Sequence, residues 1–196
     1  FKLSFNEYIQ KVTPKKIINK GKEKLEKNTV LLTSIEKDFT IPRSLIVSLW
    51  GIETHFGKHT GNFDVLNSLA TLSYEGRRAK FFYKEFVNAL QIIDNEFIDR
   101  RNLRGSWAGA IGQTQFMPST FINYAIDFDS DGKKNLLNSK ADALASGANY
   151  LKKIGWDIDK NWGEEVKLNL QENPIFTKLS NDKSSRKKKL LVKKRS

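Results

Sequence analysis

The fold is decided by residues 41–57, which read Ile41-Pro42-Arg43-Ser44-Leu45-Ile46-Val47-Ser48-Leu49-Trp50-Gly51-Ile52-Glu53-Thr54-His55-Phe56-Gly57. The spacing predicts a helix over 42–54, because Pro42 suits the first turn of a helix and Gly57 suits a left-handed stop just past its end. Apolar side chains lie nearly all round this helix, so we expect it to be buried. One carboxylate, that of Glu53, stands in its last turn.

The predicted position of Glu53 gives its carboxylate an unusual environment. Glu53 follows Ile46, Leu49 and Trp50 by seven, four and three residues, which predicts one shared helix face. Partial desolvation on that face and the negative end of the helix dipole both favour the protonated form, so we expect a raised pKa. A neutral carboxylic acid is what protonation of a glycosidic oxygen requires. The alternative is that Glu53 turns out to solvent at a frayed helix end.

Helical spacing also runs through most of the remaining chain. It predicts near-helical repeats over 15–39, an amphipathic helix over 78–98, a short helix after Pro118, and a helix from about 141 to 154 that closes at Gly155. Alternating apolar residues are scarce, and 165–170 is the best candidate for a strand. We therefore expect a mainly α fold.

Composition and charge narrow the class of protein. The 196 residues suffice for one domain with a sizeable core, and no apolar run approaches the roughly 20 residues of a membrane-spanning helix. Because there is no cysteine, disulfides and thiolate metal sites are excluded. The net charge of +12 would suit a nucleic-acid binder, but it divides into +5 for 1–28, −1 for 29–182 and +8 for 183–196. The middle of the chain is electrically ordinary, so we do not expect nucleic acid as the partner.

Four ordered blocks carry a resemblance to a known family. The first contains Trp-Gly-x-Glu-Thr-x-Phe-Gly within 41–57, and the second runs from 69–74 into Arg77-Arg78-Ala79. The third covers 105–119 and the fourth covers 127–156, with Ala148-Asn149-Tyr150-Leu151 inside it. Over about residues 10–165, these blocks resemble the B-type lytic murein transglycosylases. The resemblance implies a lysozyme-like catalytic domain, of the goose-type lysozyme and transglycosylase kind, with little β structure.

The resemblance implies that the chain cuts the β-1,4 bond between N-acetylmuramic acid and N-acetylglucosamine in peptidoglycan. Glu53 would protonate the leaving oxygen and then act as base towards the muramyl C6 hydroxyl, which closes a 1,6-anhydro ring without water. No cofactor is implied for this chemistry. Ordinary glycosidases need two carboxylates, and the sequence offers one convincing candidate, which fits such an intramolecular attack. A hydrolytic muramidase and a non-catalytic peptidoglycan-binding module are the alternatives.

Matching positions imply roles for five further residues. Ser106 would hydrogen-bond the catalytic glutamate, Gln115 would reach the sugar, and Tyr150 would line the cleft. Arg77 and Arg78 match an arginine pair suited to the carboxylates of the muramyl peptide. Without the family match, the serine would be interpreted as a turn residue and the glutamine as a surface amide. The tyrosine would be interpreted as a core residue and the two arginines as solvated side chains.

Residues 127–138 have the pattern of an EF-hand loop. Asp127, Asp129 and Asp131 occupy positions 1, 3 and 5, with glycine at position 6. Lys133 holds position 7, and Asn138 stands at position 12, where a bidentate glutamate is usual. We expect these residues to bind a structural Ca²⁺ with a Kd of about 10⁻⁴–10⁻³ M. The alternative is an Asx-rich turn that binds no ion.

The patterns divide the chain into four parts. They are a basic helical segment (1–28), the catalytic domain (29–165), an irregular extension (166–182) and a basic tail (183–196) that we expect to be disordered. The tail would let a monomeric enzyme contact anionic wall polymers or a membrane surface. The resemblance implies peptidoglycan strands as the partner and a periplasmic or cell-envelope location. The family's later Tyr-Asn segment has no match after Trp156, so we expect a fragment or a trimmed member with an open groove.

Overall fold

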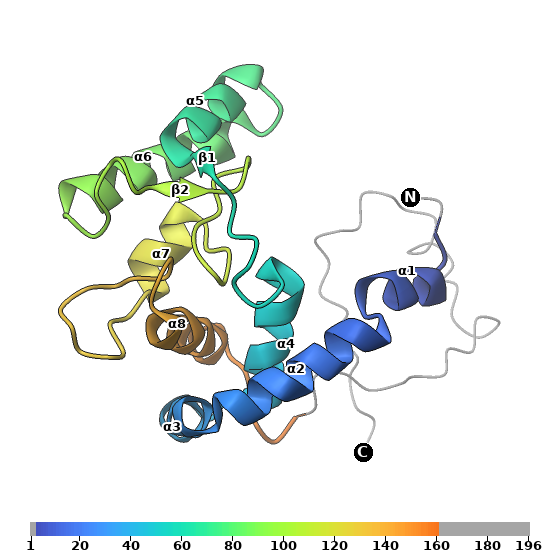
Figure 1. Cartoon of the computed structure of the whole chain (residues 1–196). Helices are drawn as coiled ribbons and strands as arrows, with labels where there is room; N and C mark the ends of the chain where they lie inside the picture. Colours follow the sequence, from blue (N-terminus) through green and yellow to red (C-terminus); the bar gives the residue numbers. More distant parts are fainter. Residues whose placement is uncertain (1–2, 161–196) are drawn as a thin grey trace, which may run out of the picture. The chain divides into compact units, whose positions relative to one another are not determined.

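The computed structural model describes residues 3–160, and over these residues the chain is mainly α, as predicted (Figure 1). The described elements are α1 (Phe5–Val12), α2 (Lys15–Lys27), α3 (Thr29–Phe39), α4 (Arg43–Thr54), β1 (Phe63–Asp64), α5 (Val65–Glu75), α6 (Ala79–Asp94), β2 (Arg104–Gly105), α7 (Pro118–Tyr124) and α8 (Lys140–Lys153). The strands pair antiparallel, Phe63 with Gly105. The strand candidate 165–170, the extension and the basic tail lie outside the described residues.

Two apolar clusters form the core, and α8 takes part in both. The first is built mainly by α5, α6 and α7 around the buried Leu69 and Phe121. The second is built by α3, α4 and α8 around Trp50 and Leu144, with α2 packed against it. Tyr150 of α8 packs on the first cluster. The boundary between the clusters therefore runs along α8 and α4, which is where a pocket can open.

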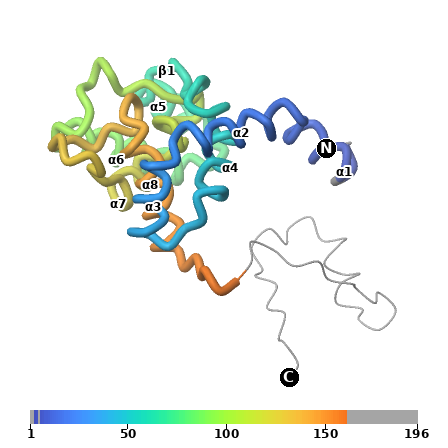
Figure 2. The backbone as a smooth tube through the Cα atoms, turned by 60° about the horizontal axis from the view of Figure 1, so that its bottom comes forward, coloured from blue at the N-terminus to red at the C-terminus, as the bar shows by residue number. Residues whose placement is uncertain are grey.

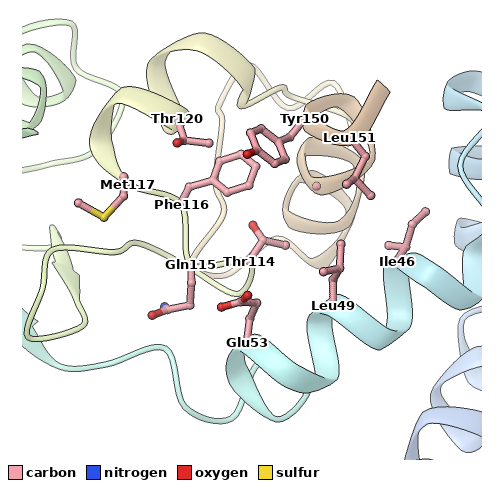
Figure 3. A pocket seen from close by; sticks show the side chains of 11 residues that line it. Ile46, Leu49, Glu53, Thr114, Gln115, Phe116, Met117, Thr120, Tyr150 and Leu151 are labelled. Carbon is pink, nitrogen blue, oxygen red and sulfur yellow. The ribbon is translucent and has the colours of Figure 1, made fainter. Parts of the chain in front are cut away.

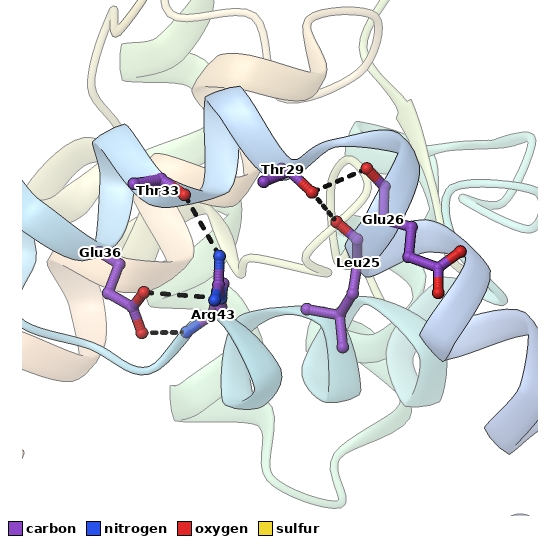
Figure 4. Close-up of polar contacts among 6 residues, drawn as sticks. All are labelled: Leu25, Glu26, Thr29, Thr33, Glu36 and Arg43. Atoms are coloured by element: carbon purple, nitrogen blue, oxygen red, sulfur yellow. Dashed lines mark hydrogen bonds and ion pairs between the residues drawn. The ribbon is translucent and has the colours of Figure 1, made fainter.

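The N-terminal end of α4 is held by α3 (Figure 4). The backbone N–H of Arg43 donates to Glu36 Oε1 at 3.0 Å, and Arg43 Nε lies 3.7 Å from Glu36 Oε2. Arg43 Nη1 also donates to Thr33 Oγ1 at 3.3 Å. Pro42 is the N-cap rather than a first-turn residue, and it has no side-chain acceptor. Glu36 therefore supplies the acceptor that the first turn of α4 lacks.

The C-terminal end of α4 lies at Thr54, as predicted, and the left-handed backbone begins before Gly57. The two residues after Thr54 already have positive φ values of 51° and 62°. Phe56 N donates to Trp50 O at 3.1 Å, which ends the helix. The Phe56 ring then folds back edge-on to Trp50, and a Cβ on Gly51 would lie 2.8 Å from it. This ring packing offsets the cost of the left-handed backbone.

The repeat over 15–39 is split into two helices at Asn28. Asn28 Nδ2 donates to Lys24 O at 2.7 Å. Thr29 Oγ1 donates to Glu26 O at 2.8 Å (Figure 4). Both side chains bind carbonyl groups in the last turn of α2, so the apolar spacing continues while the helix does not.

The helix predicted over 78–98 begins at Ala79 and ends at Asp94. Asn95 Nδ2 donates to Gln91 O at 2.9 Å, and the next residue has a positive φ of 57°. Phe97 keeps the apolar spacing but lies on the returning chain, where its ring packs 6.1 Å from that of Phe121. Local side-chain capping again overrides the periodicity.

The basic N-terminal segment packs on α4 through α2. Ile17 and Leu25 join the second cluster, and Lys24 Nζ lies 5.4 Å from the centroid of the Trp50 ring. In both Figure 1 and Figure 2, α1 lies at the outer end of α2, away from α7 and α8. Within residues 3–160, none of the helices has the length and hydropathy to cross a membrane.

Candidate active site

A pocket of about 230 Å³ lies where α4, residues 114–120 and α8 meet (Figure 3). Glu53 is the only carboxylate among the described residues that line it. The other lining residues are mostly apolar or uncharged: Ile46, Leu49, Thr114, Gln115, Phe116, Met117, Thr120, Gly147, Tyr150 and Leu151. These walls come from both apolar clusters. The pocket therefore presents one ionisable acid to a ligand.

The Glu53 carboxyl points into this pocket, with the Gln115 side chain beside it and Tyr150 across from it (Figure 3). Glu53 as a whole residue is exposed, yet the pocket wall removes part of the water around its carboxyl group. This desolvation raises the pKa of Glu53 above its ordinary value. The predicted direction of the shift is confirmed, and burial is its cause. An acid in this state is suited to donating a proton.

Trp50 does not share the pocket face of Glu53, so that part of the prediction is wrong. Ile46 and Leu49 line the pocket with Glu53, whereas Trp50 is 2% exposed and faces the core. Its Nε1 donates to Gln113 Oε1 at 3.0 Å. A residue three positions earlier in a helix is rotated by about 60°, and the buried indole follows its hydrogen-bond partner.

Gln113 joins the end of α4 to the loop before α8. Thr54 Oγ1 donates to Gln113 O at 2.7 Å, and the Thr54 side chain is fully buried. On the other side, Gln113 N donates to Leu136 O at 2.9 Å and Gln113 Nε2 donates to Leu137 O at 3.3 Å. Sequence reasoning missed this network, because these residues are 59 and 24 positions apart and share no local pattern.

Two predicted substrate residues lie in the pocket with Glu53. Gln115 Nε2 donates to Thr60 O at 3.1 Å and to Gly112 O at 3.0 Å, which orients its amide. Its Oε1 then remains an acceptor with no donor among residues 3–160. Tyr150 lines the pocket and also packs on the rings of Phe116 and Tyr124. It is therefore both a pocket residue and a core residue.

Three predicted substrate residues lie outside this pocket. Ser106 Oγ accepts from Ala110 N at 3.0 Å, and in the described part of the chain it makes no hydrogen bond to Glu53. Arg77 and Arg78 are exposed at the start of α6, and the Arg78 guanidinium lies 4.2 Å from the centroid of the Phe81 ring. The Ser106 hydroxyl is bound within its own Gly-rich loop, and the two arginines lie in the connection between α5 and α6.

The EF-hand-like loop brings two of the predicted carboxylates, Asp127 and Asp129, close to a third that the spacing does not predict. Oxygens of Asp127, Asp129 and Asp142 lie within 4.8 Å of one another, close enough to share one cation. Asp131 instead accepts from the Lys133 N–H at 2.8 Å. Asn138 is exposed, and its N–H donates to Asn135 Oδ1 at 3.0 Å.

The sequence pattern missed Asp142, the third carboxylate of this group. Asp142 lies in the first turn of α8, after position 12 of the EF-hand-like loop. It is fully buried, and its two oxygens accept from Phe128 N and Asn135 N, each at 2.8 Å. This carboxylate fastens both halves of the loop to α8. The residues present therefore suit a divalent cation with oxygen ligands.

A family model described as "Transglycosylase SLT domain" matches residues 1–195. The chain belongs to this family. Over 119 residues it is 44% identical to "Membrane-bound lytic murein transglycosylase B" of Escherichia coli K12, a match that covers 60% of this chain and 33% of the relative. The resemblance carried by the four sequence blocks is thereby confirmed. The chain spans about a third of the length of this curated SLT-domain relative.

Solved structures of SLT-domain proteins share the fold. SltB3 from Pseudomonas aeruginosa, in complex with NAG-NAM-pentapeptide, aligns with a TM-score of 0.80 and 40% identity, over 86% of this chain and 45% of that one. Escherichia coli Slt35, in complex with calcium, aligns with a TM-score of 0.71 and 38% identity, over 79% of this chain and 49% of that one. The expected lysozyme-like, mainly α fold is confirmed.

A substitution at Gly57 tests how closely the turn after α4 approaches Gln113. Its φ is +79°, and an added Cβ would lie 2.5 Å from Gln113 Oε1. Gly57→Ala should cost about 1 kcal/mol for the left-handed backbone and about 1–3 kcal/mol more for the clash, measured by chemical denaturation. Gly76→Ala is the matched control, because Gly76 has a φ of +96° and no atom within 4 Å of the added Cβ. Equal losses in the two variants would contradict the packing described.

Proposed function

We propose that this chain is a lytic transglycosylase that cleaves the β-1,4 bond between N-acetylmuramic acid and N-acetylglucosamine and leaves 1,6-anhydro-muramyl ends. The observation that carries the proposal is the single desolvated carboxyl of Glu53 in a pocket with no other carboxylate among its described lining residues. One relative, SltB3, crystallised once with NAG-NAM-pentapeptide and once with NAG-anhNAM-pentapeptide, supports this substrate and product.

One carboxyl group suffices for both proton transfers of this reaction. Protonated Glu53 gives its proton to the glycosidic oxygen as the C1–O4 bond breaks. The resulting carboxylate accepts the proton of the muramyl C6 hydroxyl as the O6–C1 bond forms. The substrate supplies its own nucleophile, so no water is consumed, and a hydroxyl held in place reacts more readily than a diffusing water.

The neighbours of Glu53 supply orientation. Gln115 offers Oε1 as an acceptor for a sugar hydroxyl or amide, because its donors are held by Thr60 and Gly112. Tyr150 offers an aromatic wall beside Phe116. The exposed Arg77 and Arg78 suit the carboxylates of a stem peptide that extends from the pocket. The Ser106 hydroxyl, which accepts from Ala110, keeps its own proton to donate to Glu53 or to substrate after a local movement.

The experiment is digestion of insoluble peptidoglycan, followed by mass spectrometry of the soluble products. We expect muropeptides that are one water lighter than hydrolysis products and that borohydride does not reduce. Glu53→Gln should lower the rate by about 10²–10⁴-fold, because it removes the proton donor and base. Glu75→Gln, at an exposed site, is the matched control and should leave the rate unchanged.

Each alternative has its own signature in this experiment. Products with reducing ends would identify a hydrolytic muramidase. Binding to insoluble peptidoglycan without release of fragments would identify a binding module. Full activity in Glu53→Gln would overturn the assignment of the site.

We propose that the enzyme acts in the cell envelope, where its glycan substrate lies, and that it works as a monomer. Segments 1–28 and 183–196 carry the basic excess of the chain, and such charge favours contact with anionic wall polymers or lipid headgroups. Nucleic acid is not proposed as a partner, because residues 29–182, which hold the pocket, carry a net charge of −1.

We further propose that the loop over 127–138 holds a structural Ca²⁺. Asp127 and Asp129, with Asp142 from α8, supply three carboxylates within 4.8 Å of one another. Lys133 and Asn138 offer backbone and side-chain oxygens at positions 7 and 12. A relative crystallised with calcium supports this proposal. Such an ion would strengthen the attachment of the loop to α8 and take no part in proton transfer.

Thermal melting with added salts tests the cation site. About 10 mM CaCl₂ should stabilise the wild type by about 1.4–2.7 kcal/mol if the Kd is about 10⁻³–10⁻⁴ M. Asp129→Asn should abolish most of this gain, whereas Asp94→Asn, at an exposed helix end, should keep it. A gain that persists in Asp129→Asn would show that the loop is not the site, and an equal gain with MgCl₂ would show that the site does not select Ca²⁺.

A further inference from the structure

In the segment 113–116, three side chains line the pocket and one lies in the protein interior. Thr114, Gln115 and Phe116 line the pocket with Glu53. Gln113 does not line it and is 8% exposed. Its amide faces the buried side of α4 instead, where Oε1 accepts from Trp50 Nε1. Gln113 thus touches the catalytic helix from behind, out of reach of a ligand in the pocket.

We propose that Gln113 is a positioning residue for Glu53, which holds the last turn of α4 at a fixed distance from the pocket wall. This role rests on the proposed function of Glu53. Gln113 binds α4 at two points, because its side chain holds the Trp50 indole and its carbonyl holds the Thr54 hydroxyl at 2.7 Å. Trp50 and Thr54 flank Glu53 in the last turn of the helix.

The anchor behind Gln113 is the loop that precedes α8. Gln113 N donates to Leu136 O at 2.9 Å, and Nε2 donates to Leu137 O at 3.3 Å. Leu136 is fully buried, so the first of these carbonyls cannot move freely. Gln113 therefore connects two fixed elements, and each end of its amide has a partner.

The Gln113 amide supplies an acceptor and a donor at the same time. Its Oε1 accepts from the buried indole N–H of Trp50, and its Nε2 donates to the carbonyl of the partly buried Leu137. Gly57 leaves the space for the amide, because a Cβ there would lie 2.5 Å from Gln113 Oε1. An apolar side chain of equal length would leave the buried indole N–H unpaired, and the last turn of α4 would shift to regain a partner.

The experiment compares wild type with Gln113→Met, which keeps the length of the side chain and removes both polar ends. Gln91→Met, at an exposed site on α6, is the matched control. The readout is the titration of the Glu53 side-chain carboxyl, followed by carbon-detected NMR in each protein. This measurement needs no substrate and no turnover.

In the wild type, Glu53 should titrate above the ordinary glutamate value, because the pocket desolvates it. In Gln113→Met, the carboxyl should gain water, so its pKa should fall towards the ordinary value. Gln91→Met should match the wild type. A folded Gln113→Met protein with the wild-type titration of Glu53 would overturn the proposal.

Kinetics on solubilised glycan strands supply a second readout. The kcat of Gln113→Met should fall by about 10–100-fold, since displacement of a catalytic group by about 1 Å has effects of this size. KM should stay within about 2-fold, because Gln113 does not line the pocket. The alkaline limb of the rate profile should move to lower pH, as expected when a general acid has a lower pKa. Equal changes in kcat and in the amount of folded protein would indicate a purely structural role and overturn the proposal.

Trp50→Phe removes the donor of the same hydrogen bond, the indole N–H. This variant replaces Gln113→Met in the titration if Gln113→Met fails to fold. It should lower the Glu53 pKa in the same direction, and an unchanged pKa would overturn the proposal. Where both variants fold, the double variant should show much less than the sum of the single effects, because both lose one shared contact. If the wild type cleaves no peptidoglycan, the proposed function fails, while the NMR titration still decides the role of Gln113.

Discussion

The hydrogen bond from the buried Thr54 hydroxyl to the Gln113 carbonyl is the contact on which the site depends. It joins the end of α4 to the chain segment that forms the opposite wall of the pocket. The hydroxyl also donates to Trp50 O at 3.3 Å and accepts from Gly57 N at 3.0 Å, so it ties Gln113 to the last turn of α4 and to the turn that follows. Breaking the bond to Gln113 would leave that buried carbonyl unpaired, at a cost of about 1–3 kcal/mol. Glu53 directly precedes Thr54, so this contact lies beside the proposed acid.

The raised pKa of Glu53 follows from its place at the boundary between the two apolar clusters. α4 belongs to one cluster, while Phe116 and Tyr150 pack on the other, so the pocket between them is walled mainly by carbon atoms. Water is scarce on one side of the carboxyl and present on the other, which raises its pKa while leaving a route for substrate. This environment suits the proposed reaction, in which one carboxyl group donates a proton and later accepts one.

The sequence predicts those features that are encoded locally. Pro118 begins α7 and Gly155, with a φ of +97°, follows α8, as their positions indicate. Helix ends set by side-chain amides, such as that of Asn95, escape prediction because the apolar spacing continues past them. Contacts such as Trp50 with Gln113, 63 residues apart, leave no periodic trace. The candidate acid could therefore be predicted from its helix and its family, whereas the residues that hold it required the structure.

The role of Glu53 can be tested by a crystal structure of Glu53→Gln with a bound NAG-NAM oligomer. We expect the oligomer to occupy the pocket between α4 and α8, with the oxygen of one muramyl glycosidic bond about 2.6–3.2 Å from the substituted side chain. The muramyl C6 hydroxyl should lie on the same side of that bond. A well-ordered oligomer with every glycosidic oxygen beyond hydrogen-bond reach of residue 53 would show that Glu53 is not the acid.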